Sequence, residues 1–112
     1  MDILFKTTRL QSDCNDSKRA VKAYGADVAK RLRQRLDELR AAATLEVMWS
    51  LPQAHCEELK ADRKGQLSVR LPGALRLIFE PAHDPVPKRE DGGLDRVQVT
   101  AIRILEIEDY HG

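Results

Sequence analysis

The sequence predicts an α+β fold, in which two N-terminal helices pack on a twisted antiparallel sheet of four to five strands. Apolar residues recur at helical spacing between positions 27 and 43, whereas positions 57 to 107 contain runs that alternate between polar and apolar residues. A group of helices followed by strands with short turns between them is typical of the α+β class. Because 112 residues are the length of one ordinary domain, we expect a single domain over residues 1–112.

Both expected helices lie in the first half of the chain. The first should end at Tyr24, with Gly25 as its C-cap. Its candidate N-caps are Asp13, Asn15, Asp16 and Ser17. Asp27 can cap the second helix, whose apolar residues are spaced by four, three and four positions. This stripe consists of Leu32, Leu36, Leu39 and Ala43.

Charged residues fill the positions between the apolar residues of the second helix. They are Lys30, Arg31, Arg33, Arg35, Asp37, Glu38 and Arg40. We interpret them as a solvent-exposed face on which cations pair with nearby carboxylates. The alternative is a surface for an acidic partner or for RNA.

Five runs have strand character. They are Ile3 to Thr8, Glu57 to Ala61, Gln66 to Leu71, Leu75 to Glu80 and Val97 to Ile107. Gly65 and the Pro72-Gly73 pair mark turns of a meander. The run from Leu75 is apolar on both faces, which predicts a central strand. Residues 81–95 hold three of the five prolines and are expected to form a long exposed loop.

Charge and composition exclude several classes of protein. The net charge of +1 conceals a gradient from +4 over residues 1–40 to −3 over residues 81–112, so a polyanion would have to bind a local patch. The chain has no apolar run of about eighteen residues and no signal-peptide pattern, and we expect a cytoplasmic protein without a membrane span. Cys14 and Cys56 are expected to be reduced thiols, with a disulfide as the alternative.

No motif predicts a metal or a cofactor. His55, His83 and His111 are scattered, and the two cysteines form no Cys-x-x-Cys pair. A phosphate loop, a dinucleotide fingerprint and a nucleophile elbow are also absent from the sequence. We therefore expect neither a metal nor a cofactor.

Polar residues at the ends of the expected strands form the candidate site. They are Lys60, Arg70, Arg76, Asp109, Tyr110 and His111. Cations can stabilise negative charge on phosphorus in a transition state, while a phenol or an imidazole moves protons. RNA supplies its own 2′-hydroxyl nucleophile, so this set suits phosphodiester cleavage without a metal. The alternative is structural, with the strand arginines paired to carboxylates such as Glu80 or Glu106.

Three ordered segments resemble the HigB-like branch of the RelE/ParE toxin superfamily, the plasmid-maintenance killer proteins of bacterial type II toxin–antitoxin systems. The segments are Glu58 to Val69, Leu75 to Pro81 and Ile104 to His111. Tyr24-Gly25 and the stretch from Arg31 to Ala42 also fit. The Arg76-Leu-Ile-Phe strand and the closing Asp109-Tyr-His are the most specific parts of the resemblance.

The resemblance implies a small RelE-like fold with two helices and an antiparallel sheet. It also implies an mRNA endoribonuclease that acts in the ribosomal A site without a metal, and neutralisation by a HigA-type helix-turn-helix antitoxin. The implied catalytic residues are Lys60, Arg76, Asp109, Tyr110 and His111, and the implied RNA contacts are Arg63, Lys64 and Arg70. His111 or Tyr110 would transfer the proton, and Tyr110 could stack on a base.

One departure from the family pattern concerns Glu57. Many HigB-like sequences have a histidine three residues before the motif lysine, which here is Lys60. A carboxylate at this position would repel a phosphate. Two alternatives therefore stand beside the nuclease: a toxin that acts by binding alone, as in the gyrase-directed ParE branch, and a degenerate member that mainly binds antitoxin.

Overall fold

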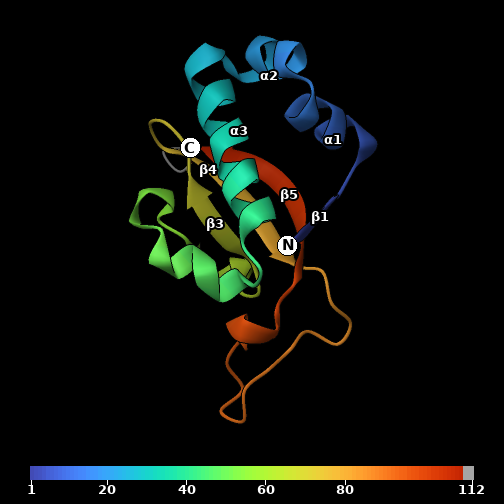
Figure 1. Ribbon diagram of the computed structural model, residues 1–112, viewed down its shortest axis with the longest axis vertical. Coiled ribbons are helices and arrows are strands. Elements are labelled where there is room, and N and C mark those ends of the chain that lie inside the picture. The colour runs from blue at the N-terminus through green and yellow to red at the C-terminus, as the bar shows by residue number, and fades with distance from the viewer. Residues whose placement is uncertain (110–112) are drawn as a thin grey trace.

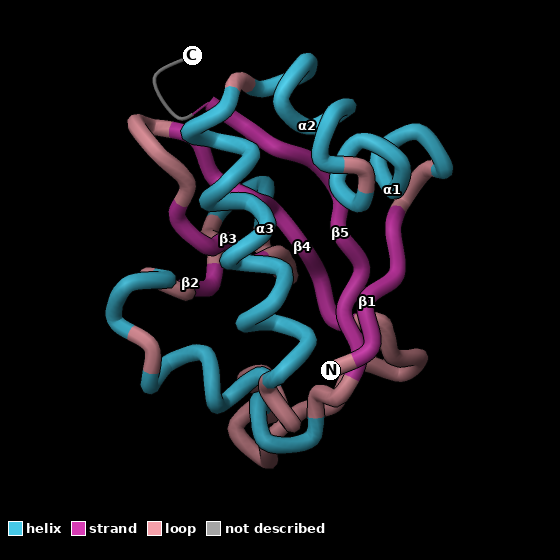
Figure 2. The backbone as a smooth tube through the Cα atoms, turned by 45° about the horizontal axis from the view of Figure 1, so that its top comes forward, coloured by secondary structure: helices cyan, strands magenta, loops and turns pink. Residues whose placement is uncertain are grey.

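The computed structural model of the protein describes residues 1–109. Over these residues the chain is α+β, and its helices lie on one side of a five-stranded sheet (Figures 1 and 2). The α-helices are α1 (Thr8–Asn15), α2 (Ser17–Tyr24) and α3 (Ala26–Ala41). The strands are β1 (Asp2–Phe5), β2 (Glu57–Glu58), β3 (Leu67–Arg70), β4 (Leu75–Pro81) and β5 (Ala101–Asp109). The 3₁₀ turns are η1 (Leu45–Ser50), η2 (Pro52–Ala54), η3 (Ala61–Arg63) and η4 (Arg96–Gln98).

The sheet is mixed, with the strand order β1-β5-β4-β3-β2. The meander β2-β3-β4 and its pairing with β5 are antiparallel, as expected, and β4 is central. The expectation of a wholly antiparallel sheet is wrong at the edge, because β1 runs parallel to β5. Parallel neighbours require a long crossover connection, and most of the chain lies between these two strands.

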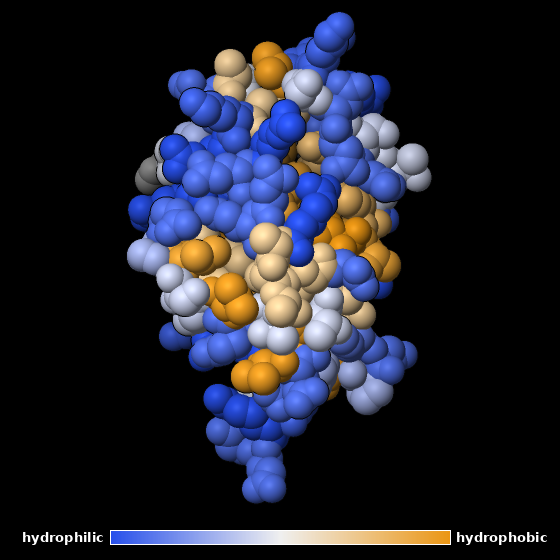
Figure 3. Space-filling model, viewed as in Figure 1, coloured by the Kyte–Doolittle hydropathy of each residue, from blue (hydrophilic) through white to orange (hydrophobic). Residues whose placement is uncertain are grey.

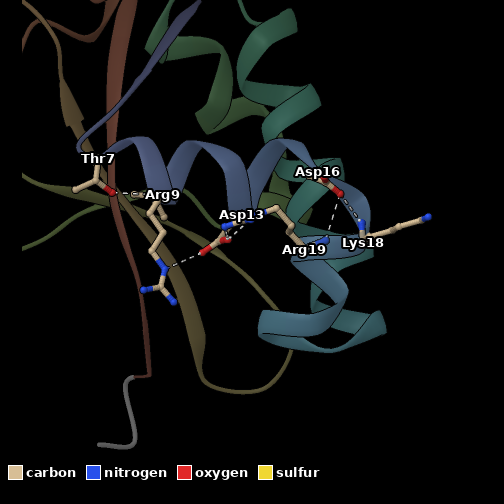
Figure 4. A network of polar contacts seen from close by, with 7 residues as sticks. Thr7, Arg9, Asp13, Asp16, Lys18 and Arg19 are labelled. Atoms are coloured by element: carbon tan, nitrogen blue, oxygen red, sulfur yellow. Dashed lines mark hydrogen bonds and ion pairs between the residues drawn. The ribbon is translucent and has the colours of Figure 1, made fainter.

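The N-terminal region forms three α-helices within the described residues, whereas two were expected. The additional helix, α1, begins because the Thr7 Oγ1 accepts a hydrogen bond from the Leu10 amide at 3.1 Å. The first strand therefore ends at Phe5, before the expected boundary. Asp16 ends α1 and caps α2, where its carboxylate accepts from the Lys18 amide at 3.0 Å (Figure 4).

The start of α3 differs slightly from the expectation. The helix begins after Gly25, which has φ of 87°, and Asp27 lies in its first turn instead of capping it. A carboxylate in the first turn still interacts favourably with the positive end of the helix dipole. The expected leucine stripe is fully buried, but Ala43 is exposed because the helix ends at Ala41.

The expectation that every charged residue of α3 is exposed to solvent is wrong at Arg35. Figure 3 shows a mostly hydrophilic surface with separate apolar patches. Arg31 and Arg33 on α3 are exposed, whereas the Arg35 side chain is only 1% exposed. Its guanidinium donates to the carbonyls of Arg70 at 2.8 Å and Gln53 at 2.6 Å. Its remaining contact is an ion pair with Glu38 at 2.9 Å. Arg35 thus ties α3 to the end of β3 and to η2.

The hydrophobic core lies between α3 and the facing side of the sheet. Its members on β3 and β4 are Leu67, Val69, Leu77 and Phe79. The pairing of β4 with β5 shifts between Ile78 and Phe79, so that Ile78 lies opposite Glu106 while Phe79 lies opposite Ile104. This bulge turns both Ile104 and Ile107 toward the core, although three positions separate them.

The loop expected over residues 81–95 follows β4 and contains one small hairpin. Lys88 and Leu94 form an isolated antiparallel bridge, and the Arg89 amide donates to the Gly93 carbonyl at 2.7 Å. The stretch that was expected to begin the last strand at Val97 forms η4 instead, and Val97 is 59% exposed. The last strand therefore begins at Ala101.

Both cysteines are free thiols. Burial raises the pKa of Cys14 to about 11 and that of Cys56 to about 12. Because the unfolded thiols ionise near pH 9 while the folded ones keep their protons, we expect stability to fall as pH rises from about 9 to 11. Urea titrations at a series of pH values measure this loss. Replacing Cys56 by alanine should reduce it, and an identical pH dependence in that variant would contradict the assignment.

Candidate functional site

The side of the sheet opposite the core carries an array of charged residues. Successive strand residues point to opposite faces, so partners across the ladder share a face. One row consists of Arg70, Arg76 and Glu108, and the next row consists of Glu57, Ser68, Ile78 and Glu106. We call these two rows, together with Arg63 above them, the charged face.

Arg63 crosses the charged face. It belongs to η3, yet its Nη2 lies 2.7 Å from a Glu106 oxygen and 2.8 Å from a Glu108 oxygen on β5. Its Nη1 donates to the Gln66 side chain at 2.7 Å. Hydrogen bonds to the two glutamates raise the pKa of the Arg63 guanidinium above its ordinary value. Arg63 is therefore engaged by carboxylates, and its side chain closes part of the face.

Arg76 sits at the start of β4 and is half-buried. Its side chain is 14% exposed, and its Nη2 lies 3.7 Å from a Glu57 oxygen on β2. Arg70 is its direct neighbour on β3, and Glu108 is its neighbour on β5. Like charges opposite each other destabilise a sheet, and the nearby carboxylates offset the repulsion between the two arginines.

The end of β5 reaches the row that contains Arg76. In the antiparallel register of β4 and β5, Asp109 lies opposite Leu75 and Glu108 lies opposite Arg76. Tyr110 and His111, which the sequence singled out for proton transfer, lie outside the described residues. Of the residues expected to be catalytic, the strand register thus brings Arg76 and Asp109 to one end of the sheet but to different faces, because Asp109 lies opposite Leu75, which packs against the core.

Lys60 does not lie beside Arg76. It lines a hollow with Lys64 and with Pro81, the last residue of β4, whereas Arg76 is the second residue of that strand. Five residues along a strand span about 17 Å. Figure 1 shows that β4 ends beside the segment that connects it to β5, so Pro81 lies near that segment and Arg76 lies toward the other end of the strand. The expected pairing of Lys60 and Arg76 around one phosphate is therefore not present.

Of the three carboxylates on the charged face, sequence reasoning named Glu57 and Glu106 and missed Glu108. Glu106 and Glu108 flank Ile107, and this alternation signals that both point away from the core. The structural alternative named Glu106 as a partner for a strand arginine, and its partner is Arg63 from a turn. The other carboxylate named there, Glu80, pairs with Arg103 at 3.6 Å.

Formal charge on the face sums to zero. Its three arginines, Arg63, Arg70 and Arg76, face three glutamates, Glu57, Glu106 and Glu108. A phosphate that approaches Arg76 would be repelled by the Glu57 carboxylate, which lies 3.7 Å from the Arg76 guanidinium. Within residues 1–109, no group of three histidine, cysteine or acidic side chains converges in a way that could hold a metal ion.

Comparison with known proteins does not assign the chain to a family. No protein-family model matches it, and no curated protein matches it significantly. Among the described residues, no helix combines the length and the apolar character needed to cross a membrane.

Proposed function

We propose that the protein is a HigB-like toxin of the RelE/ParE class, an endoribonuclease that cleaves mRNA on the ribosome. The observation that carries this proposal is the register of β4 and β5, in which Glu108, near the end of the described part of β5, lies opposite Arg76. The ordered resemblance from Glu58 to His111 and the α+β fold support it.

Cleavage would proceed by attack of the RNA 2′-oxygen on the adjacent phosphorus. The new P–O2′ bond forms as the P–O5′ bond breaks, the 2′-hydroxyl proton passes to a base, and the 5′-oxygen gains a proton. Arg76 would stabilise the added negative charge on the phosphoryl oxygens. Tyr110 or His111 would carry the protons. Lys60 has no part in this scheme, because it lines a hollow that does not include Arg76.

The proposed partners follow from this class. They are mRNA, the ribosome and a HigA-type helix-turn-helix antitoxin, all in the cytoplasm. Arg70 is exposed and lies in the same row as Arg76, so it remains a candidate RNA contact. Arg63 could contact RNA only after leaving Glu106 and Glu108.

A specific observation favours a second candidate, a member of the same class that binds its target or its antitoxin without cutting RNA. Glu57 lies beside Arg76, and Arg63 is held by two glutamates, so no net positive charge faces a phosphate. Such a protein would leave transcripts whole, and a gyrase-directed toxin would instead damage DNA.

Growth arrest on induction tests the nuclease proposal. Replacement of His111 by alanine, or of Tyr110 by phenylalanine, should relieve the arrest because proton transfer is worth about 10²–10⁴ in rate. Viable counts after induction measure the effect, and immunoblotting confirms equal protein levels. If both variants are as toxic as the parent, the closing residues are not the catalytic group.

A variant of Glu57 tests whether its carboxylate opposes the binding of a phosphate at Arg76. Replacing Glu57 by glutamine removes the carboxylate near Arg76 but keeps the shape of the side chain. We expect affinity for a short single-stranded RNA to rise roughly three- to tenfold, because one repulsive charge is lost. Fluorescence anisotropy at constant ionic strength measures this change. Glu90→Gln, in the exposed segment after β4, is the control. Equal gains in both variants would mean that net charge alone matters.

A further inference from the structure

A second site lies at the far end of the sheet from Arg76. Here the η3 turn and the segment after β4 enclose a hollow of about 590 Å³. We call it the lysine hollow, because Lys60, Lys64 and Lys88 line it. Ligand sites for small molecules have volumes of roughly 300–1,000 Å³, so the lysine hollow is large enough for a nucleotide.

The walls of the lysine hollow combine apolar surface with positive charge. Leu59, Val86 and Leu94 are among its apolar members. Glu58 supplies a carboxylate against the three ammonium groups, so the lining has a formal charge of +2. Over residues 1–109, none of the three lysines takes part in an ion pair. The lysine hollow therefore differs from the charged face, where carboxylates hold the arginines.

The wall that carries Lys88 is held by main-chain hydrogen bonds. Lys88 and Leu94 form a bridge, the Gly92 amide donates to the Arg89 carbonyl at 2.9 Å, and the Asp95 amide donates to the Pro87 carbonyl at 3.0 Å. These bonds close a small hairpin. A wall that is already ordered lowers the entropic cost of binding.

We propose that the lysine hollow binds the phosphate and base of a nucleotide. The phosphate would lie among the lysine ammonium groups, which bind phosphates as point charges, and the base would lie on the apolar walls. A phosphate monoester carries close to two negative charges at pH 7 and a phosphodiester within a strand carries one, so the formal +2 of the lining matches the monoester and still attracts the diester. The nucleotide could be free or part of an RNA strand. This inference goes beyond the proposed cleavage and does not depend on it.

Calorimetric titration tests the inference with two ligands, uridine monophosphate and a short 2′-O-methylated RNA that resists cleavage. Lys88→Glu reverses a charge in the lysine hollow, and Val86→Trp fills it without changing charge. Lys22→Glu, on the exposed part of α2, is the matched control. Thermal unfolding confirms that each variant is folded.

We expect Lys88→Glu and Val86→Trp to weaken binding roughly tenfold or more, while Lys22→Glu has little effect. Binding of the mononucleotide would identify a free nucleotide as a sufficient ligand, and binding of the RNA alone would identify a strand residue. The inference is overturned if neither ligand binds, or if Lys22→Glu weakens binding as much as Lys88→Glu. Intact transcripts on translating ribosomes, together with RNA binding in the lysine hollow, would overturn only the proposed nuclease function.

Discussion

Replacing Arg35 by alanine is expected to lower the free energy of unfolding by about 3–5 kcal/mol. The Arg35 side chain is 1% exposed, and its loss leaves two backbone carbonyls and the Glu38 Oε1 without their guanidinium donor, while the Glu38 Oε2 keeps the Gln53 side-chain amide. It also leaves a cavity in the packing between α3 and the sheet. Urea unfolding followed by circular dichroism measures the change.

Two variants control this result. Arg31→Ala removes an exposed arginine from the same helix and should change stability by no more than about 0.5 kcal/mol. Arg35→Lys keeps the charge but not the planar fork that reaches two carbonyls, so it should recover only part of the loss. If Arg35→Ala is as stable as Arg31→Ala, the assigned role of the buried guanidinium is wrong.

Replacing Arg76 by alanine is expected to reduce cleavage of mRNA by about 10²–10³-fold. The strand register places the Arg76 guanidinium at the end of β5. Without it, the negative charge that develops in the transition state of phosphoryl transfer would no longer be stabilised there. Single-turnover cleavage of a ribosome-bound transcript measures the rate. Arg103→Ala is the matched control, because Arg103 is also a strand arginine paired with a glutamate.

The outcome separates catalysis from folding. Arg76→Ala should unfold within a few degrees of the parent, and Arg103→Ala should cleave at the rate of the parent. If Arg76→Ala cleaves normally while folded, the charged face is a structural ion-pair array and no catalytic site.

Local patterns in the sequence were sufficient for much of the fold. The leucine stripe of α3 and the apolar residues on both faces of β4 report burial directly, and both are confirmed, since residues 77–79 are all buried. The parallel placement of β1 could not be read in this way, because pairing between the two ends of the chain leaves no local signal. The buried state of Arg35 was hidden for the same reason, since its partners Gln53 and Arg70 are distant in sequence.

The candidate site was only partly accessible to sequence reasoning. The polar residues at the strand ends were expected to form one site, and the antiparallel pairing of β4 and β5 does bring Arg76 to the end of β5. The position of Lys60 was not, because β2 ends at Glu58 and Ala61 has φ of 57°, which turns the chain away from the sheet direction. The engagement of Arg63 by Glu106 and Glu108 likewise depends on how η3 folds over the sheet.

Primer extension on an mRNA expressed with the protein tests the central claim most directly. Reactions run with and without translating ribosomes, for the parent, Arg76→Ala and Arg103→Ala. The nuclease proposal predicts discrete 5′ ends within the coding sequence for the parent and Arg103→Ala, only when ribosomes translate, and none for Arg76→Ala. Intact transcripts in the presence of toxic parent protein would contradict it.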